Sequence, residues 1–82
     1  MLELRQLETF RVLATTKNFT RTAAELGYSQ SSITTHINAL EKELGAALVV
    51  RRRFSKPILT DIGRRTLEYA DQILALVARI RC

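Results

Sequence analysis

The sequence predicts a mainly α-helical fold with three short helices, a two-stranded β-hairpin and one long C-terminal helix. Apolar residues recur at helical spacing over most of the 82 residues, two short β-branched runs flank a basic segment, and the helical period continues unbroken from residue 61 to at least Arg81. A chain of this length has room for one small core, so a packed second copy would add stability.

The first two helices are marked by their apolar spacing and by their end residues. The first is expected to begin near Leu4 and to end near Lys17-Asn18. Thr20 is the expected N-cap of the second helix, and Gly27 is expected to close it in a left-handed conformation.

A third helix is expected to follow almost immediately, with Ser29 as its N-cap and Gly45 at its end. Two helices joined by so tight a turn predict a helix-turn-helix over about residues 19–38. One face of the third helix is expected to be buried, with its apolar residues at Ile33, Ile37, Leu40 and Leu44.

A hairpin is expected over about residues 48–60. The runs Leu48-Val49-Val50 and Ile58-Leu59 are its predicted strands, and Pro57 fits only an edge strand or the end of one. The loop between them is basic. With the three helices, this hairpin predicts a winged helix-turn-helix domain over residues 1–60.

The last helix, over residues 61–82, is expected to be capped by Thr60-Asp61 and to act as a linker that mediates dimerisation. One of its apolar rows can cover the core, and it contains Leu67, Ala70, Leu74 and Val77. A second row would face water unless another copy covered it. The expected dimer contacts are Tyr69, Ile73, Leu76, Val77 and Ile80. The alternative is that both rows are buried internally or against a further domain.

The positive charge is concentrated in one segment. The chain has 13 basic and 8 acidic residues, and six of the basic residues and one acidic residue fall in residues 51–65. Outside this segment the basic and acidic residues are equal in number, so the net charge of +5 arises within it. A basic run alone could be a solvated loop, but this one lies beside a helix-turn-helix. The sequence therefore favours a nucleic-acid partner.

The exposed face of the third helix is expected to be polar and uncharged, with charges only in its distal half, at Glu41, Lys42 and Glu43. Short hydroxyl and amide side chains suit contact with base edges in the major groove, and the absence of acid avoids repulsion of phosphate. The residues predicted to read bases are Gln30, Ser31, Thr34, Thr35 and Asn38.

Phosphate contacts are expected from two helix N-termini and from the hairpin, because free amides and cations both attract anions. The basic loop would reach the backbone or an adjacent minor groove. A dimer would place two such helices on an imperfect inverted repeat. The predicted backbone and wing contacts are Thr20, Arg21, Ser29, Ser32, Arg51, Arg52, Arg53 and Lys56.

Other chemistry is poorly supported. The sequence has one cysteine, Cys82, and one histidine, His36, which excludes an internal disulfide and a structural zinc site. His36 is expected to be a polar surface residue. The sequence has no glycine-rich phosphate loop and no activated nucleophile. We therefore expect that the protein is not an enzyme and that this stretch binds no cofactor. No run approaches the length of a membrane span, so we expect a soluble, cytoplasmic domain.

The sequence resembles the N-terminal DNA-binding region of LysR-type bacterial transcriptional regulators along essentially its whole length. The residues that carry the resemblance are Leu4-Arg5-Gln6-Leu7, Phe10, Phe19-Thr20-Arg21, Ala23, Leu26, Ser29-Gln30-Ser31, Ile37, Leu40-Glu41-Lys42-Glu43-Leu44-Gly45, Leu48, Arg51, Leu59-Thr60 and Gly63.

The resemblance implies DNA contacts from the start of the third helix and from the wing near Arg51 to Arg53, and dimerisation through the helix from Asp61 onward. Family members also carry a large effector-binding domain, which this stretch does not include. Thr35 and His36 occupy positions where the family often has Arg and Gln. The resemblance therefore does not indicate which bases this protein prefers.

Two other binding functions compete with this interpretation. An RNA-binding module would usually present exposed aromatic platforms, and only Phe54 lies in the basic segment. A pure dimerisation module would explain the last helix but not a polar third helix beside six basic residues.

Overall fold

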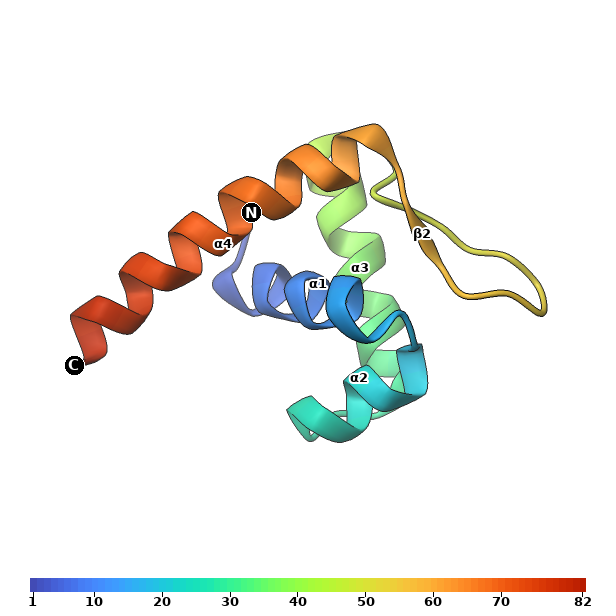
Figure 1. Ribbon diagram of the computed structural model, residues 1–82, viewed down its shortest axis with the longest axis horizontal. Coiled ribbons are helices and arrows are strands. Elements are labelled where there is room, and N and C mark those ends of the chain that lie inside the picture. The colour runs from blue at the N-terminus through green and yellow to red at the C-terminus, as the bar shows by residue number, and fades with distance from the viewer.

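A computed structural model describes all 82 residues. The elements along the chain are α1 (Leu4–Thr16), α2 (Phe19–Leu26), α3 (Gln30–Leu44), β1 (Val49–Val50), β2 (Ile58–Leu59) and α4 (Asp61–Arg81). In Figure 1, α1 to α3 form the body, the hairpin projects on one side, and α4 crosses the body and continues past it on the other. This arrangement confirms the predicted winged helix-turn-helix with a long final helix.

The core lies between α1, α3 and the start of α4. Phe10 from α1 and Ile33 and Ile37 from α3 are completely buried, as the predicted stripes require. The prediction was wrong for Leu44, which is 42% exposed. This residue lies in the last turn of α3, one turn beyond the buried Leu40 and next to the left-handed Gly45 that ends the helix.

The helix ends follow local capping rules, with one correction. Asn18, not Thr20, is the N-cap of α2, because its side-chain oxygen accepts a hydrogen bond from the Arg21 amide at 2.9 Å. Thr20 lies in the first turn instead. Ser29 caps α3 and Gly27 closes α2 with a φ of 74°, as expected.

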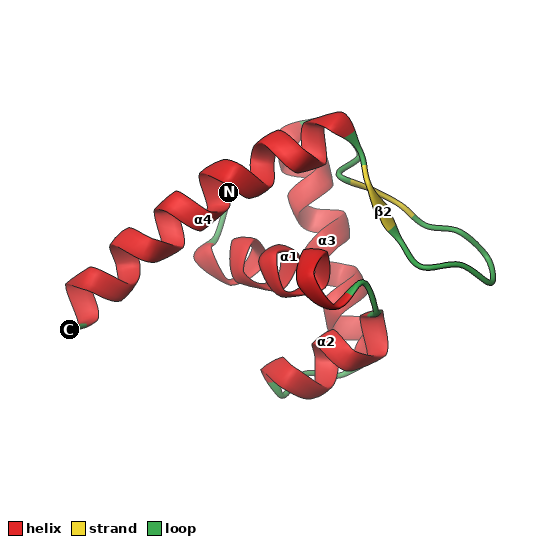
Figure 2. Ribbon diagram, in the orientation of Figure 1, coloured by secondary structure: helices red, strands yellow, loops and turns green.

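The hairpin is short, and Figure 2 shows that loop makes up most of its length. Its strands pair antiparallel, with Val49 opposite Leu59. Leu48 precedes β1 and is buried in the core. Glu41 of α3 holds this entry, because its carboxylate accepts hydrogen bonds from the amides of Leu48 at 2.8 Å and Val49 at 3.3 Å. Glu41 is therefore a structural residue and not simply a solvated charge.

The first half of α4 packs closely on the body. Gly63 and Ala70 are its buried residues. A side chain at Gly63 would clash with the backbone carbonyl of Leu48, so only glycine allows this approach. None of the helices combines the length and the apolar character that a segment crossing a bilayer requires.

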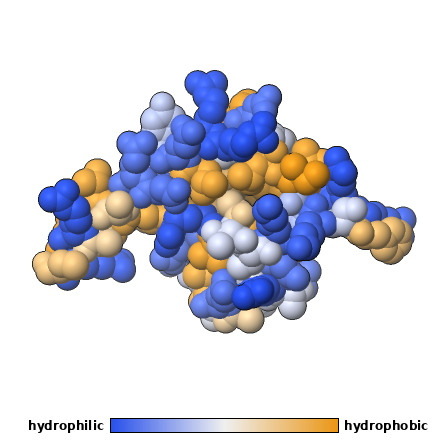
Figure 3. All heavy atoms as spheres, in the orientation of Figure 1, coloured by the Kyte–Doolittle hydropathy of each residue, from blue (hydrophilic) through white to orange (hydrophobic).

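The outer face of α4 stays in water. Figure 3 shows hydrophobic atoms at the end of the molecule where α4 leaves the body. The exposed fractions of this outer row are 61% for Tyr69, 36% for Ile73, 58% for Leu76 and 82% for Ile80. Val77 is half-buried and belongs to the inner row.

His36 is not the free surface residue that the sequence suggested. Its Nδ1 lies 2.9 Å from the hydroxyl of Thr9, which is fully buried on α1. Its ring also meets Tyr28 edge to face, with centroids 5.0 Å apart. A buried hydroxyl needs a hydrogen-bond partner, and His36 supplies one across the core.

Candidate nucleic-acid interface

The polar face of α3 is open to solvent. It is opposite the buried stripe formed by Ile33, Ile37 and Leu40. Of the residues predicted to read bases, Gln30, Ser31, Thr35 and Asn38 are exposed, and Thr34 is half-buried. These five side chains therefore share one side of the helix. None of them is charged, so the face can meet a polyanion without repulsion.

The first turns of α2 and α3 are joined by a side-chain hydrogen bond. The Thr20 hydroxyl donates to Oε1 of Gln30 at 3.2 Å. This contact restrains a long side chain that would otherwise move freely. It also leaves the amide nitrogen of Gln30 available as a donor.

A group of serines surrounds the start of α3. The Ser29 hydroxyl lies 3.1 Å from that of Ser31 and 3.0 Å from that of Ser32. The Thr35 hydroxyl donates to the Ser31 carbonyl at 2.9 Å, so it already has a partner within its own helix. Ser29 accepts hydrogen bonds from the amides of Ser32 and Ile33, and the helix dipole favours an anion at this end.

The four predicted wing cations do not have the same surroundings. Arg52, Arg53 and Lys56 are exposed and form no ion pair. Arg51 instead lies 3.4 Å from the Glu41 carboxylate, and its guanidinium carbon lies 5.5 Å from the centre of the Phe19 ring. Part of the positive charge at Arg51 is therefore balanced within the domain.

The loop of the hairpin borders two hollows. One has a volume of about 410 Å³ and lies between the starts of α2 and α3 and the loop, with Thr20, Gln30 and Phe54 in its lining. The other measures about 480 Å³ and is lined by four cations: Lys17, Arg52, Lys56 and Arg64. Of these, Arg64 pairs with Asp61. The loop thus offers positive charge on both of its sides.

Sequence reasoning did not include Lys17, Arg64 and Phe54 in this surface. Lys17 ends α1 in a left-handed conformation, with a φ of 54°. It reaches the hairpin only through the tertiary fold, and no local pattern indicates that. Phe54 stood out in the sequence as the one aromatic residue in the basic segment, but it was not assigned to the interface.

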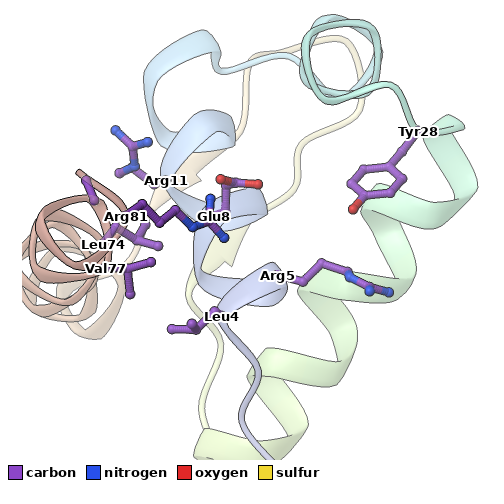
Figure 4. A pocket seen from close by; sticks show the side chains of 9 residues that line it. Leu4, Arg5, Glu8, Arg11, Tyr28, Leu74, Val77 and Arg81 are labelled. Atoms are coloured by element: carbon purple, nitrogen blue, oxygen red, sulfur yellow. The ribbon is translucent and has the colours of Figure 1, made fainter.

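Another hollow, of about 450 Å³, lies between α1 and the end of α4. Figure 4 shows Glu8, Arg11 and Arg81 side by side there, with Arg5 and Tyr28 farther along. Its lining includes no residue of the hairpin and none of the polar face of α3. No group of three or more His, Cys, Asp or Glu side chains is placed to hold a metal ion.

Comparison with known proteins identifies this architecture. Residues 4–64 match the family described as bacterial regulatory helix-turn-helix protein, lysR family. The chain belongs to the LysR family. This family consists of transcriptional regulators, which confirms the prediction of a domain that is not an enzyme.

Named LysR-family relatives match nearly all of the chain. It is 45% identical over 75 residues to the uncharacterized HTH-type transcriptional regulator YwqM of Bacillus subtilis (strain 168), covering 92% of this chain and 25% of YwqM. It is 44% identical over 75 residues to the HTH-type transcriptional regulator CatR of Pseudomonas putida, with the same two coverages. The LysR-family chain thus spans about a quarter of the length of these relatives.

Two solved structures of DNA-binding domains have the same fold as this chain. The CbnR_DBD–DNA complex superposes with a TM-score of 0.89 at 38% identity, covering 95% of this chain and 88% of that one. The BenM_DBD complex with catB site 1 DNA gives a TM-score of 0.90 at 30% identity, covering 96% and 87%. Both neighbours are DNA-binding domains crystallised with DNA.

Proposed function

We propose that this LysR-family domain binds double-stranded DNA in a sequence-specific manner, as a homodimer on an imperfect inverted repeat. In this proposal α3 lies in the major groove and reads bases through Gln30, Ser31, Thr34, Thr35 and Asn38. The observation that carries it is the uncharged, exposed face of α3 beside the unpaired cations of the hairpin loop.

Backbone contacts would fix the position of α3 in the groove. Ser29 and Ser32 at the start of α3 and Thr20 and Arg21 at the start of α2 would meet phosphates through amides, hydroxyls and charge. Arg21 is exposed, and only a 3.8 Å contact with Glu25 competes for it. Such contacts set the register, whereas the amide and hydroxyl groups of α3 discriminate between bases.

The hairpin loop would lie on the adjacent minor groove or backbone. Arg52, Arg53 and Lys56 are the cations free to do so, and Arg51 would contribute less because Glu41 already neutralises part of its charge. Arginine side chains are favoured where the minor groove is narrow and its potential is most negative. Of the four loop cations, Arg51 should therefore contribute least to DNA affinity.

Dimerisation would use the outer row of α4. Tyr69, Ile73, Leu76 and Ile80 are large, partly or mostly exposed, and evenly spread along one side of the helix. A row of this kind on a small domain marks an association surface. A two-fold dimer would present two copies of α3 to two half-sites, and we place its action in the bacterial cytoplasm.

Selection from a random duplex pool, followed by salt titration of the selected duplex, tests the proposal. We expect the wild type to enrich one motif with inverted symmetry. Arg52→Ala and Arg53→Ala should weaken binding to selected and random duplexes alike and flatten the salt slope, because fewer counterions are released. Arg79→Ala removes the same charge from α4 and is the matched control. Failure to enrich any motif would contradict sequence-specific binding.

A further inference from the structure

Phe54, at the tip of the hairpin, does not contribute to the core of the domain. The residue is 96% exposed, and it belongs to no buried cluster. Figure 3 shows hydrophobic atoms at this tip, beyond the hydrophilic sides of the hairpin. A large apolar side chain held in water suggests a partner that covers it.

The backbone at Phe54 is also unfavourable for this residue. Its φ is +65°, in the left-handed region that glycine and asparagine adopt easily and that bulky residues avoid. A turn optimised for stability would carry one of those two residues here. Neither burial nor local conformation accounts for the phenylalanine, and residues held in such conformations cluster at functional sites.

The surroundings of Phe54 favour a polyanionic partner. The guanidinium carbon of Arg53 lies 5.5 Å from the centre of its ring. Lys17, Lys56 and Gln30 line the same hollow as Phe54, and no acidic side chain does. Gln30 lies on the side of α3 proposed to face the bases. A partner that covers Phe54 would therefore lie next to the partner that α3 contacts.

We propose that Phe54 is an apolar wedge that enters the DNA minor groove next to the segment read by α3. There it partly unstacks a flexible pyrimidine–purine step and bends the duplex. Phenylalanine is one of the side chains that proteins insert in this way, and TA and CA/TG steps unstack most easily. This inference rests on the proposed function, because it needs α3 to lie in the neighbouring major groove.

The charges around the ring suit that position. A wedge must be held against an anionic backbone on both strands, and the cations on either side of the loop can contact them. Arg53 rests against the ring and would enter the groove with it, where a narrow groove attracts a guanidinium group. Phe54 would thus add specificity for a base-pair step that makes no hydrogen bond with the protein.

Phe54→Asn is the decisive variant, because asparagine tolerates the left-handed backbone and removes the ring. Phe54→Leu is its matched control, since leucine also acts as a wedge. The probe is the duplex that the wild-type domain selects from a random pool, labelled at both ends for energy transfer. Bend angle, the steps enriched on selection and the thermal midpoint of the free domain are measured for all three proteins.

We expect Phe54→Asn to fold at least as stably as the wild type, to bend the duplex less and to lose the enriched pyrimidine–purine step. Its affinity for the selected duplex should fall about tenfold, whereas Phe54→Leu should keep most of the bend. An unchanged bend and unchanged step preference in Phe54→Asn would overturn the inference. So would a larger loss on single-stranded DNA than on duplex, because that would make Phe54 a stacking platform.

The two proposals fail in different ways. If the wild type selects no motif, or if Gln30→Ala changes preference at no base pair, base reading by α3 is wrong. If the wild type selects a motif that Gln30→Ala degrades and Phe54→Asn does not, only the wedge is wrong.

Discussion

The carboxylate of Glu41 on α3 accepts a 2.8 Å hydrogen bond from the backbone amide of Leu48, where the chain enters the hairpin. The same oxygen accepts from Val49, and the other oxygen faces Arg51. Strands of only two residues each cannot hold a hairpin in place by themselves. Glu41 therefore helps to fix the wing relative to the helix that carries the residues proposed to read bases.

We expect Glu41→Ala to destabilise the domain by about 2–3 kcal/mol, because it leaves the amides of Leu48 and Val49 without their charged acceptor. Glu41→Gln keeps a neutral acceptor and should cost about 1 kcal/mol. Urea unfolding measures both. Glu43→Ala is the control, because Glu43 is exposed and its one ion pair is a 3.6 Å contact with the exposed amino group of Met1. Equal midpoints for Glu41→Ala and Glu43→Ala would show that the carboxylate does not hold the wing.

Gly63→Ala should destabilise the domain, although the same change inside a helix usually stabilises it by about 0.5–1 kcal/mol. The added methyl group would collide with the Leu48 carbonyl, so α4 must shift from the body. Overpacking of this kind costs about 1–3 kcal/mol, and a lower thermal midpoint would report it. Gln72→Ala, at an exposed position of α4, is the control. A higher midpoint for Gly63→Ala would mean that α4 does not approach Leu48 so closely.

The parts of the fold that depend on neighbouring residues could be predicted from the sequence. Ser29 and Gly27 define their helix ends through bonds within one turn, and the spacing of Ile33 and Ile37 defines the buried face. The N-cap of α2 was misplaced by two residues because Asn18 and Thr20 are both good caps. Only the path of the chain between α1 and α2 decides between them.

Contacts between distant residues were the part that could not be predicted. Thr9 and His36 are 27 positions apart, and nothing in either local sequence shows that they meet. The same holds for the surface around the hairpin. The sequence indicates a basic loop, but only the fold shows that Arg51 turns toward Glu41 and Phe19.

Gln30→Ala should relax the preference at one base pair of the selected duplex and cost about 1–3 kcal/mol there, with little effect on random DNA. Thr20→Val should weaken the preference at the same base pair, because it removes the hydroxyl that restrains Gln30. Thr20→Ser retains the hydroxyl and is the control. Adding Thr20→Val to Gln30→Ala should change nothing further at that position. Additive losses at that base pair would mean that Thr20 does not act through Gln30, whereas an equal loss on selected and random DNA would report only its separate phosphate contact.

Leu76→Glu should convert the proposed dimer to monomers, because it introduces a charge in the middle of the outer row of α4, where Leu76 is 58% exposed. Loss of the dimer should weaken binding to the two-half-site duplex far more than to a single half-site, since the link between the two recognition helices disappears. Sedimentation equilibrium measures the mass, and titration of both duplexes measures the affinity. Ala75→Glu introduces the same charge at an exposed position on another side of α4 and is the control. A Leu76→Glu protein that still sediments as a dimer would place the interface on another surface of the domain.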